Sequence, residues 1–111
     1  MRIVAKSTLR NYWLKHPDCE QALLSWYKTS VQAKWKNFNE VKNQFGTCKI
    51  LGNDRIIFKI KGNQHRLVIK ISFTNQLIFI RFIGTHSEYD LYQFNFKMSY
   101  KILILNFSSS S

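Results

Sequence analysis

The spacing of the hydrophobic residues divides the chain into a helical first part and a strand-forming second part. In the first part, apolar residues recur every three or four positions, which is the spacing of one buried helix face. Pro17 separates the first two helical runs, and the predicted helix caps are Ser7 and one of Asn37 or Asn39. The predicted elements are a strand over residues 1–5 and helices over residues 9–14, 18–34 and 39–45.

From residue 49 to residue 83 the pattern changes to an alternation of apolar and polar positions. A period of two is typical of a strand with one buried face, and here it predicts an antiparallel meander. Gly62-Asn63 is the expected two-residue hairpin turn, which would place Phe58 opposite Leu67.

The second turn of the meander falls near residues 74–76 and leaves two registers open. One register places Arg81 opposite Lys70 and the other places it opposite Val68, but both keep Phe82 on the apolar face. That face has to be covered by another layer, and the helices can cover it. We therefore predict an α+β fold, with the N-terminal strand and two to three helices packed on one face of an antiparallel β-sheet.

The opposite face of the predicted sheet is basic. Its cations are Lys59, Lys61, Arg66, Lys70 and Arg81. Lys59 and Arg66 would face each other directly, and like charges in that position are unfavourable. Such a pair indicates either full solvation or an anion lying across the sheet.

The overall charge also points to a polyanionic partner. The 111 residues include 17 Lys and Arg against 6 Asp and Glu, which gives a formal net charge of +11. A single domain with this excess more often binds RNA, DNA, the ribosome or an acidic protein than carries an unbalanced surface without function. The hydrophobic content of 45% is that of a folded globular chain.

Cys19 and Cys48 lack the spacing of a metal or redox motif, and no leader directs the chain to an oxidising compartment. Both are therefore expected to be reduced thiols. No segment approaches the roughly 20 apolar residues that a membrane helix needs. We expect a cytoplasmic protein without a membrane partner.

Polar residues capable of chemistry gather where the last predicted strand ends at Gly84. With earlier segments, this stretch resembles the signature of the HigB-type toxins, RNA endonucleases of bacterial toxin–antitoxin pairs within the RelE/ParE superfamily. The resemblance covers residues 1–90. Its main motif runs from Ile80 through Arg81, Phe82, Ile83, Gly84 and Thr85 to His86, continues with Glu88, Tyr89 and Asp90, and is preceded by Gly62, Asn63 and Arg66.

The resemblance implies the toxin of a type II toxin–antitoxin system. Such a toxin is an mRNA interferase, a small endoribonuclease that in many members cuts mRNA on the ribosome and requires no metal or other cofactor. The expected partners are mRNA, the ribosome and a cognate antitoxin, through which operator DNA would be contacted.

Cleavage of RNA by transesterification needs a base, an acid and cations that stabilise the phosphorane. An imidazole exchanges protons near neutral pH, and the planar guanidinium group suits phosphate. With the family resemblance, these requirements give a predicted catalytic set of Arg66, Arg81, His86 and Tyr89. The predicted RNA-binding residues are Lys59, Lys61 and Lys70.

Several of these residues also have a structural interpretation. Thr85 and Glu88 have the spacing of a capping box. One histidine, His86, with the carboxylates of Glu88 and Asp90 is weak support for a metal site, so none is predicted. His65, beside the hairpin turn, remains a low-ranked candidate.

Two other functions compete with an RNA endonuclease. A non-catalytic nucleic-acid-binding module would need exposed aromatic rings for stacking, but the aromatic residues of the sheet share the apolar face. A ParE-like toxin would inhibit a protein target instead of cutting RNA. The aromatic residues assigned to the core are Trp13, Trp26, Trp35, Phe58, Phe73 and Phe82.

Residues 91–111 form an atypical extension beyond the domain predicted over residues 1–90. From Tyr92 to Ile104, aromatic and aliphatic residues alternate with polar ones, which is a strand pattern, and Ser108–Ser111 are expected to be disordered. An added strand, a contact with a partner or an altered reading frame would each account for this segment.

Overall fold

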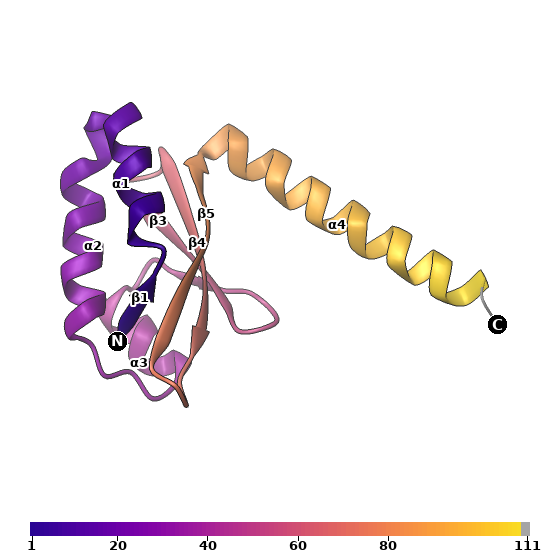
Figure 1. Ribbon diagram of the computed structural model, residues 1–111, viewed down its shortest axis with the longest axis horizontal. Coiled ribbons are helices and arrows are strands. Elements are labelled where there is room, and N and C mark those ends of the chain that lie inside the picture. The colour runs from indigo at the N-terminus through magenta and orange to yellow at the C-terminus, as the bar shows by residue number, and fades with distance from the viewer. Residues whose placement is uncertain (110–111) are drawn as a thin grey trace.

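The computed structural model describes residues 1–109 and consists of a five-stranded sheet whose one face is covered by the first three α-helices (Figure 1). The elements in chain order are β1 Arg2–Val4, α1 Lys6–Lys15, the 3-10 helix η1 Pro17–Cys19, α2 Glu20–Gln32, α3 Phe38–Gln44, β2 Lys49–Ile50, β3 Arg55–Ile60, β4 His65–Ser72, β5 Leu77–Thr85 and α4 His86–Ser109. The predicted α+β fold is confirmed.

The strand order is β1-β5-β4-β3-β2. From β2 to β5 the sheet is the predicted antiparallel meander, whereas β1 pairs with β5 in parallel, with Ile3 opposite Ile78. A parallel pair requires a long crossover connection, and here the first three helices and the meander lie between its two strands. The sheet is therefore mixed, with the N-terminal strand at its edge.

The helix boundaries follow local signals only in part. Asn37 caps α3, because its Oδ1 accepts a hydrogen bond from the Glu40 N–H at 3.0 Å. Ser7 was wrongly predicted as a cap, because α1 already begins at Lys6, after Ala5 in a left-handed conformation with φ of 76°. Pro17 ends the first helical run as predicted and opens η1.

The core lies between the sheet and α1, α2 and α3. Trp13, Trp26 and Trp35 are buried in it, which confirms their structural assignment. The sheet contributes residues of one parity, among them Ile56, Phe58, Leu67, Ile69 and Ile78. We call this side of the sheet the covered face and the other side the open face. Cys19 and Cys48 are free thiols, and both are buried.

The first hairpin has the predicted register, with Phe58 opposite Leu67. Its loop is longer than predicted, because β3 ends at Ile60 and β4 begins at His65. The turn needs left-handed backbone at Gly62, with φ of 63°, which a glycine adopts without strain.

The C-terminal extension is a helix, so the predicted added strand was wrong. α4 leaves the end of β5 and projects away from the body (Figure 1). A capping box starts this helix, and Tyr92 then packs against Phe82 of the sheet. These two contacts favour a helix more strongly than the alternating pattern favours a strand. The helix runs through Ser108 and Ser109, where disorder was expected, and Ser110 and Ser111 lie outside the described residues.

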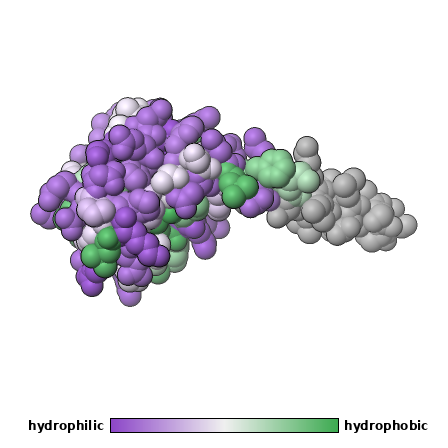
Figure 2. Space-filling view, turned by 90° about the horizontal axis from the view of Figure 1, so that it is seen from above, coloured by the Kyte–Doolittle hydropathy of each residue, from purple (hydrophilic) through white to green (hydrophobic). Residues whose placement is uncertain are grey.

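Seen from above, the body is mostly hydrophilic, and apolar residues gather where α4 leaves it (Figure 2). Leu91 and Phe94 are exposed there. None of the described helices has the length and apolar character to cross a lipid bilayer.

Candidate functional site

A β-bulge in β5 determines which side chains face away from the helices. Ile69 lies opposite Ile80, but the next pair is Val68 opposite Phe82, so Arg81 is the extra residue of the bulge. An extra residue moves the following side chains to the other face of the sheet. The prediction that Phe82 lies on the covered face was therefore wrong, and so were both expected pairings of Arg81, because they assumed an unbroken ladder.

Three aromatic rings meet on the open face after the bulge. The Phe82 and Tyr92 rings stack with their centroids 4.5 Å apart, and the Tyr89 ring is tilted against both. Gly84 allows this packing, since a Cβ at that position would lie 2.6 Å from the Phe82 ring. The rings therefore attach the first turns of α4 to β5.

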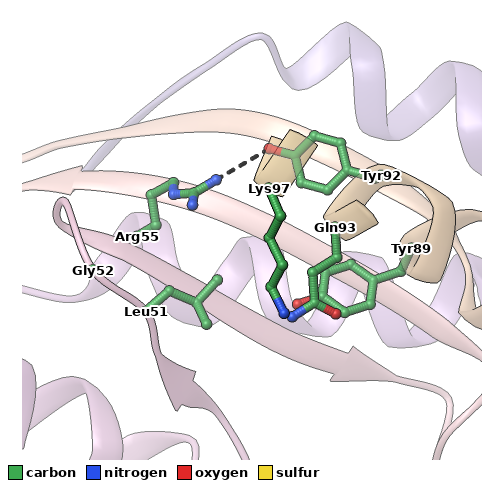
Figure 3. A pocket seen from close by; sticks show the side chains of 7 residues that line it. All are labelled: Leu51, Gly52, Arg55, Tyr89, Tyr92, Gln93 and Lys97. Carbon is green, nitrogen blue, oxygen red and sulfur yellow. Dashed lines mark hydrogen bonds between the residues drawn. The ribbon is translucent and has the colours of Figure 1, made fainter. Parts of the chain in front are cut away.

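A cleft of about 210 Å³ lies between α4 and the segment that leads into β3 (Figure 3). We call it the aromatic cleft. The Arg55 guanidinium donates a hydrogen bond of 3.3 Å to the Tyr92 hydroxyl, and Lys97 extends from α4 toward the same space. The lining residues are Leu51, Gly52, Arg55, Tyr89, Tyr92, Gln93 and Lys97.

A second hollow, of about 260 Å³, shares Arg55 and Tyr92 with the aromatic cleft. Arg55 and Lys70 face each other across β3 and β4. The Arg81 guanidinium lies 5.7 Å from the centroid of the Phe79 ring, which is a cation–π geometry. We call this site the cation hollow, and its lining residues are Asn53, Arg55, Lys70, Arg81 and Tyr92.

Arg66 points to the open face, yet its side chain is buried and the residue is only 6% exposed. Its guanidinium donates hydrogen bonds to the backbone oxygen and the Oδ1 of Asn63, at 2.8 and 2.7 Å, and to the backbone oxygen of His65 at 3.3 Å. Lys59 lies opposite Arg66 as predicted and is exposed to water. These uncharged oxygens take up the donors of the Arg66 guanidinium and leave its positive charge in place.

Tyr89 lines the aromatic cleft, and the charge of Arg66 acts on its hydroxyl. Burial raises the pKa of its hydroxyl above the ordinary tyrosine value, and the charges of Arg55 and Arg66 oppose that rise. The hydroxyl is therefore protonated at neutral pH. In this state it can donate a hydrogen bond or a proton.

His86 is the first residue of α4, and its side chain is 53% exposed. Its Nδ1 lies 3.7 Å from the carboxylate of Asp90, one turn later. The helix start is fixed by the predicted capping box, because the Thr85 N–H donates to Glu88 Oε1 and the Glu88 N–H donates to Thr85 Oγ1. Thr85 and Glu88 thus have a structural role, and they hold the backbone that presents His86.

The predicted RNA-binding lysines line two different hollows. Lys70 lies in the cation hollow with Arg81. Lys59 and Lys61 line a different hollow, and Lys61 forms an ion pair of 3.4 Å with Asp18 of η1.

On the covered face, a hydrogen-bonded chain joins three side chains. The Tyr12 hydroxyl lies 2.6 Å from His65 Nδ1, and His65 Nε2 lies 2.8 Å from the Asp18 carboxylate. The hydrogen bond with His65 lowers the pKa of the Asp18 carboxyl. With Asp18 ionised, Nε2–H donates to it and Nδ1 accepts from Tyr12. Both ring nitrogens are thus used inside the fold, which gives His65 a structural role.

Within residues 1–109, no three His, Cys, Asp or Glu side chains come together as a metal site would require.

Residues 19–92 match the model of the HigB_toxin family, the RelE-like toxic component of a toxin–antitoxin system. The chain belongs to this family. The match includes the bulge and the capping box, and it ends at Tyr92.

Individual HigB proteins are similar along most of their length. The chain is 26% identical over 95 residues to the mRNA interferase toxin HigB of Escherichia coli K12, covering 83% of this chain and 90% of that protein. It is 26% identical over 92 residues to the mRNA interferase HigB of Escherichia coli O6:H1, covering 81% and 89%. The mRNA interferase HigB of Shigella flexneri shows 26% identity over 95 residues.

The site of this HigB-family chain includes residues that the sequence did not single out. Arg55 could have been found, because the predicted hairpin register already places it opposite Lys70. Tyr92, Gln93 and Lys97 were missed because their segment was predicted to be a strand, and a strand would not bring all three to one cleft.

Proposed function

We propose that the chain is an mRNA interferase, an endoribonuclease toxin controlled by a cognate antitoxin. Membership in the HigB family supports the toxin role, and the names of the similar proteins support the substrate. The observation that carries the proposal is on the open face. There a protonated tyrosine, Tyr89, lies beside a hollow in which three cations converge.

In the proposed reaction, the 2′-hydroxyl of a nucleotide attacks its own 3′ phosphorus. A bond from phosphorus to O2′ forms and the bond to O5′ breaks, which leaves a 2′,3′-cyclic phosphate and a 5′-hydroxyl. His86 takes the proton from the 2′-hydroxyl and Tyr89 gives one to the leaving O5′. Because the nucleophile belongs to the substrate, the reaction requires no metal ion and no other cofactor.

The arginines have different parts in this scheme. Arg81 lies in the cation hollow and binds the non-bridging oxygens of the scissile phosphate, where a guanidinium fits with two donors. Arg66 acts from its buried position, where its charge is held near the Tyr89 hydroxyl and favours the negative charge that develops there.

We further propose that cleavage takes place on translating ribosomes in the cytoplasm. A net charge of +11 favours association with ribosomal RNA through release of counterions. Lys59, Lys61 and Lys70 contribute to RNA binding. The antitoxin would cover the open face with acidic or apolar groups, and the pair would contact operator DNA through the antitoxin.

Expression of the toxin in growing cells, followed by primer-extension mapping of transcripts, tests this proposal. Cuts confined to translated regions are expected, and the purified reaction on ribosomes should yield 5′-hydroxyl ends. Intact transcripts in growth-arrested cells would contradict the proposal and point to a protein target. RNA binding without cuts would favour the non-catalytic module.

A further inference from the structure

We propose that the aromatic cleft is a subsite for one unstacked nucleobase of the substrate RNA. This proposal rests on the proposed endonuclease function. It adds that the toxin selects its cleavage position by recognising this nucleobase. Proteins recognise single-stranded RNA by stacking splayed bases on aromatic side chains and by hydrogen bonds to the base edges. The aromatic cleft offers both kinds of contact.

Tyr92 is held in place as a stacking platform. One face of its ring lies on Phe82, at 4.5 Å and 19°, and its hydroxyl accepts the hydrogen bond from Arg55. A ring fixed in this way loses little conformational freedom when a ligand binds. The Tyr89 ring lies 6.4 Å away and is tilted by 34°, so a base that stacks on one ring would meet the other at an angle.

The polar groups of the aromatic cleft suit a base and its phosphate. The carboxamide of Gln93 carries a donor and an acceptor side by side, so it pairs best with a base edge that presents the matching acceptor and donor. Lys97 and Arg55 place positive charge at the cleft, where the flanking phosphate of the same nucleotide would lie (Figure 3). Leu51, across from α4, adds apolar surface.

The size of the cleft limits its occupant to one small group, and its position favours a base of the substrate over a side chain of a protein partner. Its volume of about 210 Å³ is smaller than the roughly 300–1,000 Å³ of pockets that enclose drug-sized ligands. The cleft also adjoins the cation hollow, because Arg55 and Tyr92 line both. One RNA strand could therefore place its base in the cleft and its backbone over Lys70 and Arg81.

A pair of 2′-O-methyl RNA oligonucleotides, one with a single abasic position, tests the subsite without cleavage. The wild-type protein should bind the complete oligonucleotide more tightly than the abasic one in fluorescence anisotropy at low salt. Tyr92→Leu should weaken binding of the complete oligonucleotide by about 5- to 150-fold, the range for one base stacked on an aromatic ring, and should remove the difference between the two. The matched control is Tyr27→Leu on the covered side, which should keep that difference.

Gln93→Ala provides a second variant that leaves the aromatic packing intact. It should change which base at the probed position is bound best while the fold, followed by circular dichroism, is unchanged. Gln32→Ala, at the exposed end of α2, is its control and should leave base preference as in the wild type.

Two results would overturn the subsite. One is equal binding of complete and abasic oligonucleotides by the wild type, which would leave the aromatic cleft to an antitoxin side chain. The other is a preference for the complete over the abasic oligonucleotide that persists in Tyr92→Leu, together with an unchanged base preference in Gln93→Ala. Because these probes cannot be cut, discrimination against the abasic RNA together with intact transcripts in cells would contradict the endonuclease and not the subsite. Mapped cuts without such discrimination would contradict the subsite alone.

Discussion

His65 and Arg66 are neighbours in β4, yet their side chains meet opposite conditions on the two faces of the sheet. His65 points to the covered face, where Tyr12 and Asp18 use both of its ring nitrogens. Arg66 points to the open face, where it donates hydrogen bonds to Asn63 and its charge opposes the rise in the pKa of Tyr89. The covered face thus pairs its polar groups with one another, whereas the open face gathers cations around a cleft.

This difference separates titratable residues that stabilise the fold from those available for chemistry. A buried polar group with all its hydrogen bonds made is a structural element, and losing one partner is costly. Cations that converge on one hollow repel one another, and a bound polyanion would relieve that repulsion. Arg55, Lys70 and Arg81 form such a group.

Replacing His86 should have the largest effect on activity. His86→Ala removes the proposed proton acceptor and should slow single-turnover cleavage on ribosomes by about 10²- to 10⁴-fold. The fold should remain, because the side chain is 53% exposed. Ser87→Ala, on the same exposed turn, is the control and should cut normally. Near-normal cleavage by His86→Ala would remove this histidine from the mechanism.

On the covered face, the corresponding change should act on stability. His65→Ala leaves the Tyr12 hydroxyl buried without its partner, and the free energy of unfolding should fall by about 1–3 kcal/mol in urea denaturation. The cleavage rate per folded molecule should be nearly unchanged, and His86→Ala should show normal stability. A folded but inactive His65→Ala protein would place this histidine in the chemistry.

The pH dependence of stability should distinguish Asp18. Its pKa is lower in the folded than in the unfolded state, so the ionised carboxylate stabilises the fold above the unfolded value of about 3.9. That contribution is lost as the pH falls through the lower, folded-state pKa. Asp18→Asn should therefore be less stable than wild type at pH 7, and the gap should close in acid. A gap independent of pH would argue against an ionic role.

Two truncations should show which C-terminal residues are required for RNA binding and cleavage. Deletion of residues 99–111 keeps every residue of the aromatic cleft and should leave cleavage little changed. Deletion of residues 91–111, at the predicted domain boundary, also removes Tyr92, Gln93 and Lys97 and should reduce RNA binding. Equal activity of the two proteins, both checked by circular dichroism, would favour a boundary after residue 90 and contradict a role for the cleft.

Much of the fold could be predicted from the sequence because its signals are local and periodic. Alternation and the first turn gave the register of Phe58 with Leu67, and Thr85 with Glu88 gave the capping box. The parity of Phe82 could not be predicted, since a bulge depends on packing between strands and leaves little trace in composition.

The candidate site was predicted less completely than the fold. Family resemblance singled out Tyr89 and His86, and the structure shows how α4 presents them. Arg66 was expected to be accessible, but it is buried and its guanidinium bonds Asn63 in the preceding turn, a side-chain conformation that residue spacing does not reveal. The part of the aromatic cleft formed by α4 was not predicted, because the aromatic residues of α4 also recur with the period of a strand.

Cleavage by Arg81→Ala measured beside Arg10→Ala tests most directly whether the open face carries the chemistry. Both arginines are exposed, but Arg81 lies in the cation hollow and Arg10 lies on α1, on the covered side. Single-turnover rates on programmed ribosomes should fall by about 10²- to 10³-fold for Arg81→Ala, the loss typical of a charge-stabilising donor, and should be normal for Arg10→Ala. Equal rates for the two variants, or a larger loss for Arg10→Ala, would contradict this assignment.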